Sequence, residues 1–388
     1  MPARRENCVK AIYRCWAEID LDALRENLSW IRHRVGPGVK IMTVVKADAY
    51  GHGLKQIAAL LMQSGTDVFG VANLAEARIL HNVGRGWPVL LLGACLPTET
   101  EAAVADGVAV TVSSLAEARR FSRAARRLRK TARVHVKVDT GMGRLGIPAE
   151  AAAELVRRLA RFPGLEIEGI YTHYSSVEDD PAFSRSQRTR FERFLKDLDL
   201  RRVQVRWIHA NNSGGLLHEP GTVFNLVRPG LLVYGVPPPG RRPVRAPWLR
   251  RLRPALSFHC RVGFVKAVPP GTPLSYGRAF VASRRMKVAT LTAGYGDGYL
   301  RAAGNRARVL IRGRRCRVVG RVTMDQMMVD VTRVKGVKAG DEAVLIGRQG
   351  RHTITASDLA GWCGTVPWDV LTAISNRVPR LYRGSQAA

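Results

Sequence analysis

The chain has 388 residues, of which 46% are hydrophobic and 24% are charged. This length favours two domains, and the composition is typical of a globular protein rather than a disordered one. No apolar run is long enough to span a bilayer, and the basic N-terminal residues 1–16 lack the apolar core of a secretion signal. These observations argue against a membrane protein and predict a cytoplasmic one.

The formal net charge is +31, from 62 lysines and arginines against 31 acidic residues. Such a charge favours non-specific attraction to polyanions. The densest basic runs, 124–131 and 240–253, resemble a helix face and a linker, and aromatic residues do not alternate regularly with them. We therefore interpret the charge as a surface property and expect no specific nucleic-acid partner. Salt-dependent, saturable DNA binding would support the alternative.

The six cysteines are scattered and form no C-x-x-C pair. Their spacing predicts neither a zinc site nor a disulfide framework, and it is typical of a protein in a reducing cytoplasm. No metal site is expected. The cysteines are Cys8, Cys15, Cys95, Cys260, Cys316 and Cys363.

Residues 17–35 are predicted to form an opening helix, because apolar residues recur at helical spacing from Leu24 to Val35 and Asp20 or Asp22 can cap its start. Short apolar runs then alternate with helical stretches. Repeated units of this kind predict an α/β fold, an N-terminal (β/α)8 TIM barrel with its chemistry where the strands end. The predicted strands are 41–45, 68–72, 89–94, 108–112, 134–139, 167–173, 205–210 and 231–235.

A Pro/Arg-rich connector, 235–248, marks a change in the character of the chain. Strand-like runs separated by turn residues follow it, so the second domain is predicted to be mostly β. We expect a barrel domain over 1–245 and a β domain over 246–388, with one short helix at 356–361. The predicted strands lie within 257–268, 286–295, 307–322, 327–332 and 342–347.

Lys46 directly follows the apolar strand 41–45 and precedes a turn rich in small residues. Burial at a strand end lowers the pKa of a lysine and leaves a free amine, which can condense with an aldehyde. The simpler alternative is a lysine whose side chain extends to solvent at the end of a strand. On this local pattern alone, the lysine that extends to solvent is the more frequent case.

A set of motifs follows one another in a fixed order along the chain. The motifs are VVKADAYGHG (44–53), VDTGMGRLG (138–146), YTHYSS (171–176), ANNSGG (210–215), LVRPGLLVYG (226–235), PLSYGRAF (273–280), AGYGDGYLR (293–301), GRVTMDQMMVD (320–330) and ISNRVPRLYR (374–383). With this ordered set the chain resembles the alanine racemase family from about Ala17 to Arg383. The resemblance implies a barrel that binds pyridoxal 5'-phosphate (PLP), a C-terminal β domain, and production of D-alanine for peptidoglycan.

The resemblance implies two catalytic residues. Lys46 resembles the lysine that holds the cofactor and that exchanges a proton on one face of the substrate. Tyr276 resembles the tyrosine that acts on the opposite face, and in this family it comes from the partner subunit, which implies a homodimer. Taken alone, Tyr276 would be interpreted as a packed tyrosine of a β domain.

Further residues match the surroundings of the cofactor. Arg228 resembles the arginine that faces the pyridine nitrogen, and His173 the histidine behind it. Arg144 resembles the arginine near the substrate carboxylate, where a planar fork suits an anion. Lys137 matches a lysine that can be carbamylated in this family. Without the resemblance, His173 and Lys137 would be interpreted as ordinary residues at or near strand ends.

By the same resemblance, backbone N–H groups and hydroxyls bind the phosphate, the backbone N–H of Met324 meets the substrate carboxylate from the other subunit, and two residues line the entrance. Turn and core packing is the simpler interpretation of Met324 and Tyr295. The phosphate-binding residues are Tyr50, Ser213, Gly230 and Leu231, and the entrance residues are Tyr295 and Arg301.

Three residues depart from the common family pattern: Asp48, Thr323 and Asn376. Asn376 replaces a larger tyrosine and leaves more room near the substrate side chain. This favours, as an alternative, a broader racemase acting on serine or a larger amino acid. A PLP-dependent decarboxylase of the same architecture and a non-catalytic PLP carrier are more distant alternatives; Arg228 and Tyr276 argue against the first, and the strand-rich half after Pro254 against the second.

Overall fold

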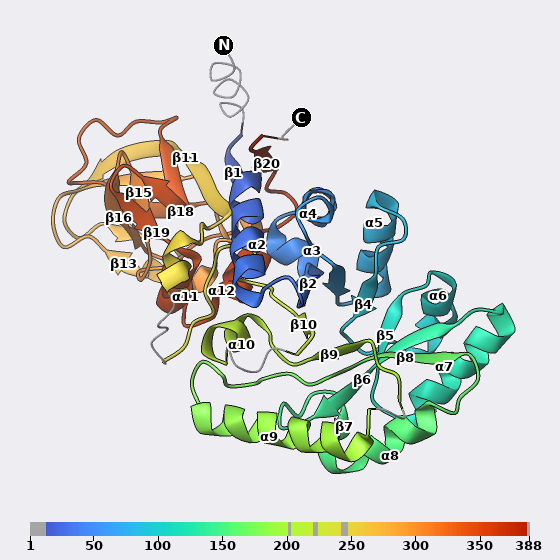
Figure 1. Ribbon diagram of the computed structural model, residues 1–388. Helices are drawn as coiled ribbons and strands as arrows, with labels where there is room; N and C mark the ends of the chain where they lie inside the picture. Colours follow the sequence, from blue (N-terminus) through green and yellow to red (C-terminus); the bar gives the residue numbers. More distant parts are fainter. Residues whose placement is uncertain (1–12, 201–202, 220–223, 242–246, 386–388) are drawn as a thin grey trace. The chain divides into compact units, whose positions relative to one another are not determined.

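The computed structural model describes residues 13–200, 203–219, 224–241 and 247–385 (Figure 1). The chain forms two compact units. The barrel unit comprises Leu24–Ala49 and Gly53–Arg253, and the β unit comprises Met1–Ala23, Tyr50–His52 and Pro254–Ala388. The N-terminal strand and the short segment 50–52 therefore belong with the C-terminal half of the chain. Among the described residues, no helix is long and apolar enough to cross a membrane.

The barrel unit contains eight parallel strands in the order β10-β2-β3-β4-β5-β6-β8-β9. No ladder joins β9 to β10, but Arg228 N–H donates to the carbonyl of Asn211 at 2.8 Å and Ile208 N–H donates to the side chain of Asn225 at 2.7 Å. The barrel is thus nearly closed, which confirms the predicted architecture. The strands are β2 (Lys40–Val44), β3 (Val68–Val71), β4 (Val89–Leu91), β5 (Ala109–Val112), β6 (Ala132–Asp139), β8 (Leu165–Tyr171), β9 (Trp207–His209) and β10 (Leu226–Val227), with β7 (Ile147–Pro148) paired to β6.

Two predicted elements are wrong. The run 231–235 is not a strand but a series of turns, with Val233 N–H bonded to the carbonyl of Gly230 at 2.9 Å, and the eighth strand is β10 just before it. The run is apolar because it is buried, and burial alone does not distinguish a strand from a buried turn. The opening helix begins at Leu21, because 17–20 pair as part of a strand, β1 (Cys15–Asp20), in the β unit.

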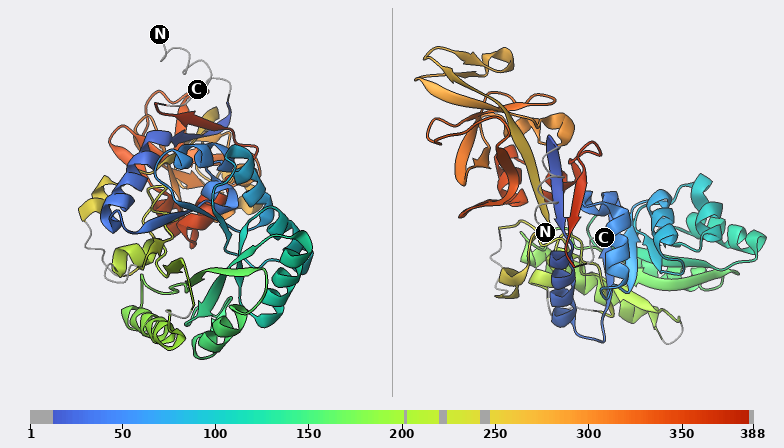
Figure 2. Two further views of the ribbon diagram at one scale, coloured as in Figure 1. Left: turned by 45° about the vertical axis from the view of Figure 1, so that its right-hand side comes forward. Right: turned by 90° about the horizontal axis from the view of Figure 1, so that it is seen from above.

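Helices follow most of the barrel strands, and α7, α8 and α9 flank the outside of the sheet (Figures 1 and 2). Asn73, Ser114 and Asp180 cap the N-termini of α5, α7 and α9 with side-chain oxygens, the usual role of these residue types. The basic run 124–131 lies at the end of α7 with most of its arginines exposed. The helices are α2 (Leu21–Val35), α3 (Lys46–Gly51), α4 (Leu54–Met62), α5 (Leu74–Val83), α6 (Thr100–Ala105), α7 (Leu115–Leu128), α8 (Ala149–Leu159), α9 (Pro181–Leu198) and α10 (Ser213–His218), with 3-10 turns at Pro97–Glu99 and Pro247–Arg251.

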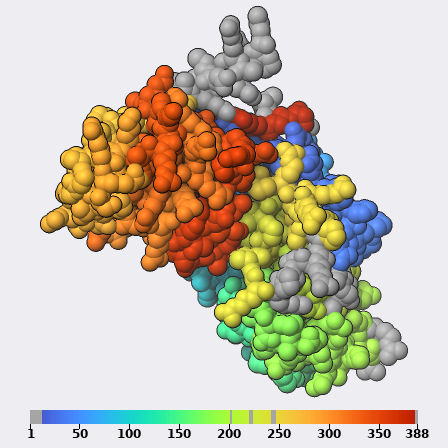
Figure 3. Space-filling view, turned by 90° about the vertical axis from the view of Figure 1, so that its left-hand side faces the viewer, coloured from blue at the N-terminus to red at the C-terminus, as the bar shows by residue number. Residues whose placement is uncertain are grey.

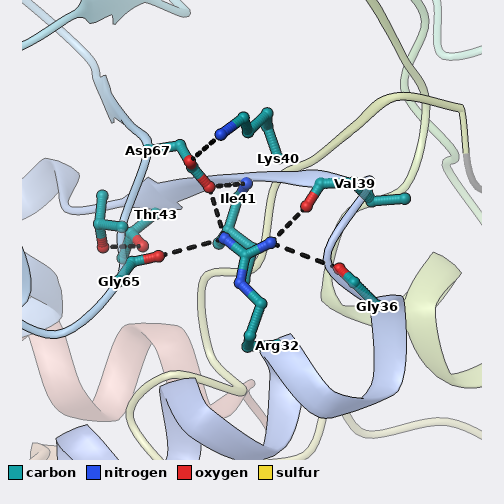
Figure 4. Close-up of polar contacts among 9 residues, drawn as sticks. Arg32, Gly36, Val39, Lys40, Ile41, Thr43, Gly65 and Asp67 are labelled. Atoms are coloured by element: carbon teal, nitrogen blue, oxygen red, sulfur yellow. Dashed lines mark hydrogen bonds and ion pairs between the residues drawn. The ribbon is translucent and has the colours of Figure 1, made fainter.

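A polar cluster around Asp67 fixes the strand that leads to Lys46 (Figure 4). Arg32 of α2 donates to Asp67 at 2.5 Å, and Lys40 Nζ and the N–H of Ile41 donate to it at 2.9 Å. Burial alone would raise the pKa of the Asp67 carboxyl, but these hydrogen bonds bring it below its ordinary value. Asp67 therefore stays ionised and ties β2 to β3 and α2.

The β unit is built on a nine-stranded sheet in the order β19-β18-β15-β16-β17-β14-β11-β1-β20. Because β11 also pairs with β18, part of this sheet closes on itself. In Figure 3 the C-terminal part of this unit, drawn in orange to red, forms one continuous body. This confirms the mostly-β prediction. The strands of the sheet are β1, β11 (Leu256–Val268), β14 (Met286–Leu291), β15 (Arg308–Ile311), β16 (Arg314–Val319), β17 (Met327–Asp330), β18 (Glu342–Gln349), β19 (His352–Ile354) and β20 (Arg380–Arg383), and β12 (Pro273–Leu274) pairs with β13 (Phe280–Val281) in a separate two-stranded sheet.

Two helices accompany this sheet, α11 (Ala356–Cys363) and α12 (Pro367–Thr372). The sequence predicted the first over 356–361 and did not predict the second. Three 3-10 turns interrupt the loops, at Tyr276–Arg278, Tyr295–Asp297 and Arg301–Ala303. The five described cysteines are free, whereas Cys8 lies outside the described residues.

Candidate active site

Lys46 lies where β2 ends and α3 begins, and the residues after it have an unusual backbone. Ala47 to Tyr50 have φ values of 52°, 53°, 52° and 53°, in the left-handed region. This conformation costs about 1–2 kcal/mol per residue for L-amino acids, so the surroundings must stabilise it. Asp48 contributes, because its carboxylate accepts from Leu54 N–H at 2.7 Å and its carbonyl accepts from Gly53 N–H at 3.0 Å.

Glu76 fixes the backbone directly after Lys46. Its two carboxylate oxygens accept from the N–H groups of Ala47 at 2.7 Å and Ala72 at 2.8 Å, which joins the ends of β2 and β3. Burial and the positive charge of Arg144 lower the pKa of the Lys46 amine, and Glu76 partly opposes them. A larger fraction of Lys46 is therefore neutral at neutral pH than of a solvent-exposed lysine.

Arg228 follows β10 and is almost fully buried. Its Nη2 donates to the carbonyls of Thr172 at 2.8 Å and Ala210 at 2.9 Å, and its Nη1 lies 2.6 Å from Nδ1 of His209. Burial lowers the pKa of this guanidinium to about 10, which still leaves it protonated at neutral pH. Three strand ends thus converge on one fixed cation.

His173 lies beside Arg228, with its Nδ1 at 3.3 Å from Nη2 of the arginine. Burial and the Arg228 charge lower the pKa of His173 well below its ordinary value, so the ring is neutral. An arginine can only donate, so Nδ1 of His173 can only accept from it. Nε2 of His173 lies 3.4 Å from the amide Nδ2 of Asn212.

A small group of donors lies between α10 and the turn after β10. Ser213 Oγ accepts from Gly230 N–H at 2.9 Å and from Leu232 N–H at 3.4 Å. In the part of the chain that the structure describes, no acceptor is bonded to the buried N–H of Leu231. A hydroxyl and an unused backbone donor at a strand end fit an anionic group such as a phosphate.

Lys137, on β6, is buried, with Nζ 5.1 Å from the centre of the Tyr171 ring. Burial and then the charge of Arg228 lower its pKa to about 7, with Arg144 adding to the effect and Asp139 opposing it. Asp139 also shapes the loop that carries Arg144, because it accepts from the N–H groups of 141, 142 and 143 at 2.9–3.2 Å. Arg144 itself is exposed.

The remaining predicted site residues belong to the β unit, where three of them stand out as exposed large side chains. Tyr276 is 72% exposed, Met324 53% and Tyr295 42%. Backbone bonds tie two of these turns together: Tyr295 N–H donates to the carbonyl of Thr323 at 3.0 Å and Gly296 N–H to that of Met324 at 2.8 Å. The turns that carry Tyr295 and Met324 therefore lie side by side.

Arg377 connects these two turns through the carboxylates of Asp297 and Asp325. Its Nε donates to Asp297 at 2.8 Å and its Nη2 to Asp325 at 2.6 Å, and Asp297 also accepts from Gly294 N–H at 2.9 Å. Ordered backbone with exposed apolar side chains is typical of a surface built for contact. Tyr50 and Arg301 also belong to the β unit.

The barrel unit thus brings together Lys46, Lys137, Arg144, His173, Ser213, Arg228, Gly230 and Leu231 near strand ends. Sequence reasoning missed Glu76, His135, Glu168 and His209, which contact or electrostatically influence this group. A polar residue at a strand end was available as a signal for His209. Nothing local in the sequence distinguishes Glu76 from other helix glutamates.

Family models match both halves of the chain: "Alanine racemase, N-terminal domain" over residues 19–238 and "Alanine racemase, C-terminal domain" over residues 255–382. The chain belongs to the alanine racemase family. An alanine racemase of Symbiobacterium thermophilum is 44% identical over 375 residues, which cover 96% of this chain and 98% of that protein.

Solved structures of alanine racemases agree. One from Clostridium difficile has a TM-score of 0.89 and 34% identity and covers 96% of this chain and 97% of its own. One from Bartonella henselae, described with covalently bound pyridoxal phosphate, has a TM-score of 0.86 and 28% identity and covers 96% of this chain and 100% of its own. The resemblance to alanine racemases predicted from the ordered motifs is confirmed.

Proposed function

We propose that the chain is a PLP-dependent alanine racemase that interconverts L-alanine and D-alanine. The observation that carries this proposal is a lysine with a lowered pKa at the mouth of a barrel whose chain matches the alanine racemase family throughout. The D-alanine would supply peptidoglycan synthesis in the cytoplasm.

The donor set of the barrel fits PLP. The Lys46 amine would hold the aldehyde, and Arg228 would face the ring nitrogen. The phosphate would be bound by Ser213, Gly230, Leu231 and Tyr50. When bound, PLP withdraws electrons from the substrate and makes its Cα proton acidic. Arg228 keeps its own proton at neutral pH, so it would donate to the ring nitrogen without protonating it, which would disfavour transamination and other side reactions.

Two residues would move the proton. Lys46 acts on one face of the Cα, and Tyr276 of a second copy of the chain acts on the other, so the active form is a homodimer with shared sites. The high exposure of Tyr276 and Met324 supports this arrangement, because a two-fold dimer would cover both. His173 would orient Tyr276.

The substrate carboxylate would be bound by Arg144 from the barrel unit and by the backbone N–H of Met324 from the partner copy. Tyr295 and Arg301 would line the entrance. The bonds of Arg377 to Asp297 and Asp325 support a fixed position for Met324 relative to Tyr295. Because the β unit contains both residues, it would supply Tyr276 and Met324 as one body.

We also propose that Lys137 is carbamylated: its neutral amine adds to CO2 and releases one proton, which leaves an anion near Arg144. Since the pKa of Lys137 is about 7, we expect the modification to increase as pH rises through 7 at a fixed concentration of dissolved CO2. A carbon-13 carbamate signal after incubation with labelled CO2 measures it. The Lys137→Gln variant should lose the signal, and a wild-type signal that appears only above pH 10 would contradict the proposal.

The experiment that tests the function is a chirality assay on purified protein with single L-amino acids, with and without added PLP. We expect D-alanine to form from L-alanine and the activity of PLP-stripped protein to return with PLP. A panel including serine separates an alanine racemase from the broader racemase that Asn376 suggested. Release of carbon dioxide without racemisation would indicate a decarboxylase and contradict the proposal.

A further inference from the structure

Four side chains form a continuous hydrogen-bonded chain inside the barrel unit. Nη1 of Arg228 lies 2.6 Å from Nδ1 of His209, Nε2 of His209 lies 2.9 Å from Nδ1 of His135, and Nε2 of His135 lies 3.2 Å from Oε2 of Glu168. Their exposed fractions are between 0% and 6%. These hydrogen-bonded side chains lead from the proposed cofactor site into the interior of the barrel. No role given above requires His209, His135 or Glu168.

The chemistry of the two ends sets the direction of every bond. Arg228 can only donate, so Nδ1 of His209 accepts, and a neutral ring then carries its proton on Nε2. Nε2 of His209 donates to Nδ1 of His135, whose own proton is therefore also on Nε2. That proton is donated to the carboxylate of Glu168. Both imidazoles are fixed in one tautomer by groups that they touch on either side.

The backbone is arranged to place Glu168 in this chain. The register of β6 against β8 shifts between Val134, which pairs with Ile167, and His135, which pairs with Gly169, so Glu168 is the additional residue of a bulge. Bulges redirect a side chain out of the regular alternation of a strand. A Cβ on Gly169 would lie 2.3 Å from Nδ1 of His135, so this position has no room for any larger residue.

The hydrogen-bonded series from Arg228 to Glu168 also connects two opposite charges. Arg228 is a buried cation, and Glu168 is a buried carboxylate. Burial alone would raise the pKa of Glu168, but the hydrogen bond from His135 and the charges of Arg133 and Arg206 bring it below its ordinary value. Burial lowers the pKa of both His135 and His209, so neutral rings connect the two charges. Breaking one member leaves an unpaired buried group, which is costly.

We propose that Glu168 is a positioning residue which, through His135 and His209, holds the Arg228 guanidinium in one orientation toward the cofactor ring. His209 contacts Nη1 of Arg228, and the carbonyls of Thr172 and Ala210 accept from Nη2. No described residue accepts from Nε of Arg228. The ring nitrogen would then meet a donor whose direction is set from inside the barrel. The part that concerns the cofactor rests on the proposed function.

The first test uses PLP-free protein and nitrogen-15 NMR of its histidines. In the wild-type chain we expect His135 and His209 to be neutral with the proton on Nε2. Glu168→Gln keeps an acceptor oxygen, so the Nε2–H signal of His135 should persist, whereas Glu168→Leu removes the acceptor, so that signal should shift and its proton should exchange faster with solvent. Unchanged signals in Glu168→Leu, or a wild-type ring protonated on Nδ1, would overturn the proposal.

The second test uses PLP-loaded protein and remains available if Glu168→Leu does not fold. Deleting the charge in Glu168→Gln is expected to lower kcat about 10-fold or more, with KM for alanine changed by less than about 2-fold, and to shift the visible absorption of bound PLP. The matched control is Glu166→Gln, which removes the same charge from an exposed position of the same strand. Equal effects of the two variants would overturn the positioning role.

The two tests separate the inference from the function on which it rests. A protein that does not racemise alanine would overturn the proposed function, and the NMR signals of the PLP-free protein would still decide whether Glu168 fixes the imidazoles. A racemase whose Glu168→Gln variant matches the wild type in kcat and absorption would overturn the inference alone.

Discussion

Lys46→Ala is expected to abolish racemisation of alanine, with a loss of at least about 10⁴-fold in kcat/KM. The variant removes both the amine that would hold PLP and the base on one face of the substrate. The measurement is a chirality assay, accompanied by borohydride reduction and peptide mapping of the wild-type protein, which should fix the cofactor on Lys46.

Lys55→Ala is the matched control, because Lys55 is an exposed lysine of α4 in the same unit. It should leave activity and labelling unchanged. Folding of both variants is checked by thermal unfolding of the PLP-free proteins. Their unfolding temperatures should be similar, because no described residue is hydrogen-bonded to the Lys46 side chain. Reduction that fixes the cofactor on another lysine would refute the assignment.

Tyr276→Phe is expected to reduce racemisation about 10²–10⁴-fold, because proton transfer on one face of the Cα is lost. The equilibrium constant of racemisation is one, so kcat/KM must fall equally in both directions and turnover cannot identify the missing base. Exchange of the Cα proton with solvent can: it should fall strongly for one enantiomer and persist for the other, through Lys46.

The control for this variant is Tyr13→Phe, another tyrosine of the β unit that has no proposed role in the site. It should preserve exchange for both enantiomers. Equal loss of exchange for L- and D-alanine in Tyr276→Phe would count against two bases. Mixing Tyr276→Phe with Lys46→Ala subunits should restore part of the racemisation, because some mixed dimers contain one site with both residues intact.

The βα rhythm and the ordered motifs were sufficient to predict the barrel, the β domain and the family. They failed at 231–235, because an apolar run reports burial and this run is buried in turns. They also extended the opening helix over 17–20, since the pairing of β1 with β11 and β20 depends on strands more than 230 residues away. Long-range pairing leaves no signal in a local period.

The sequence by itself determined which residue types stand at the strand ends: the lysine after β2, the arginine after β10 and the serine that begins α10. Only the tertiary structure decided their chemical state. The pKa of Lys137 near 7, the neutral His173 and the directed bonds from Arg228 to Glu168 arise because four strands bring their charges together away from water. Desolvation and charge are properties of that arrangement, whereas periodicity and motif order belong to the chain.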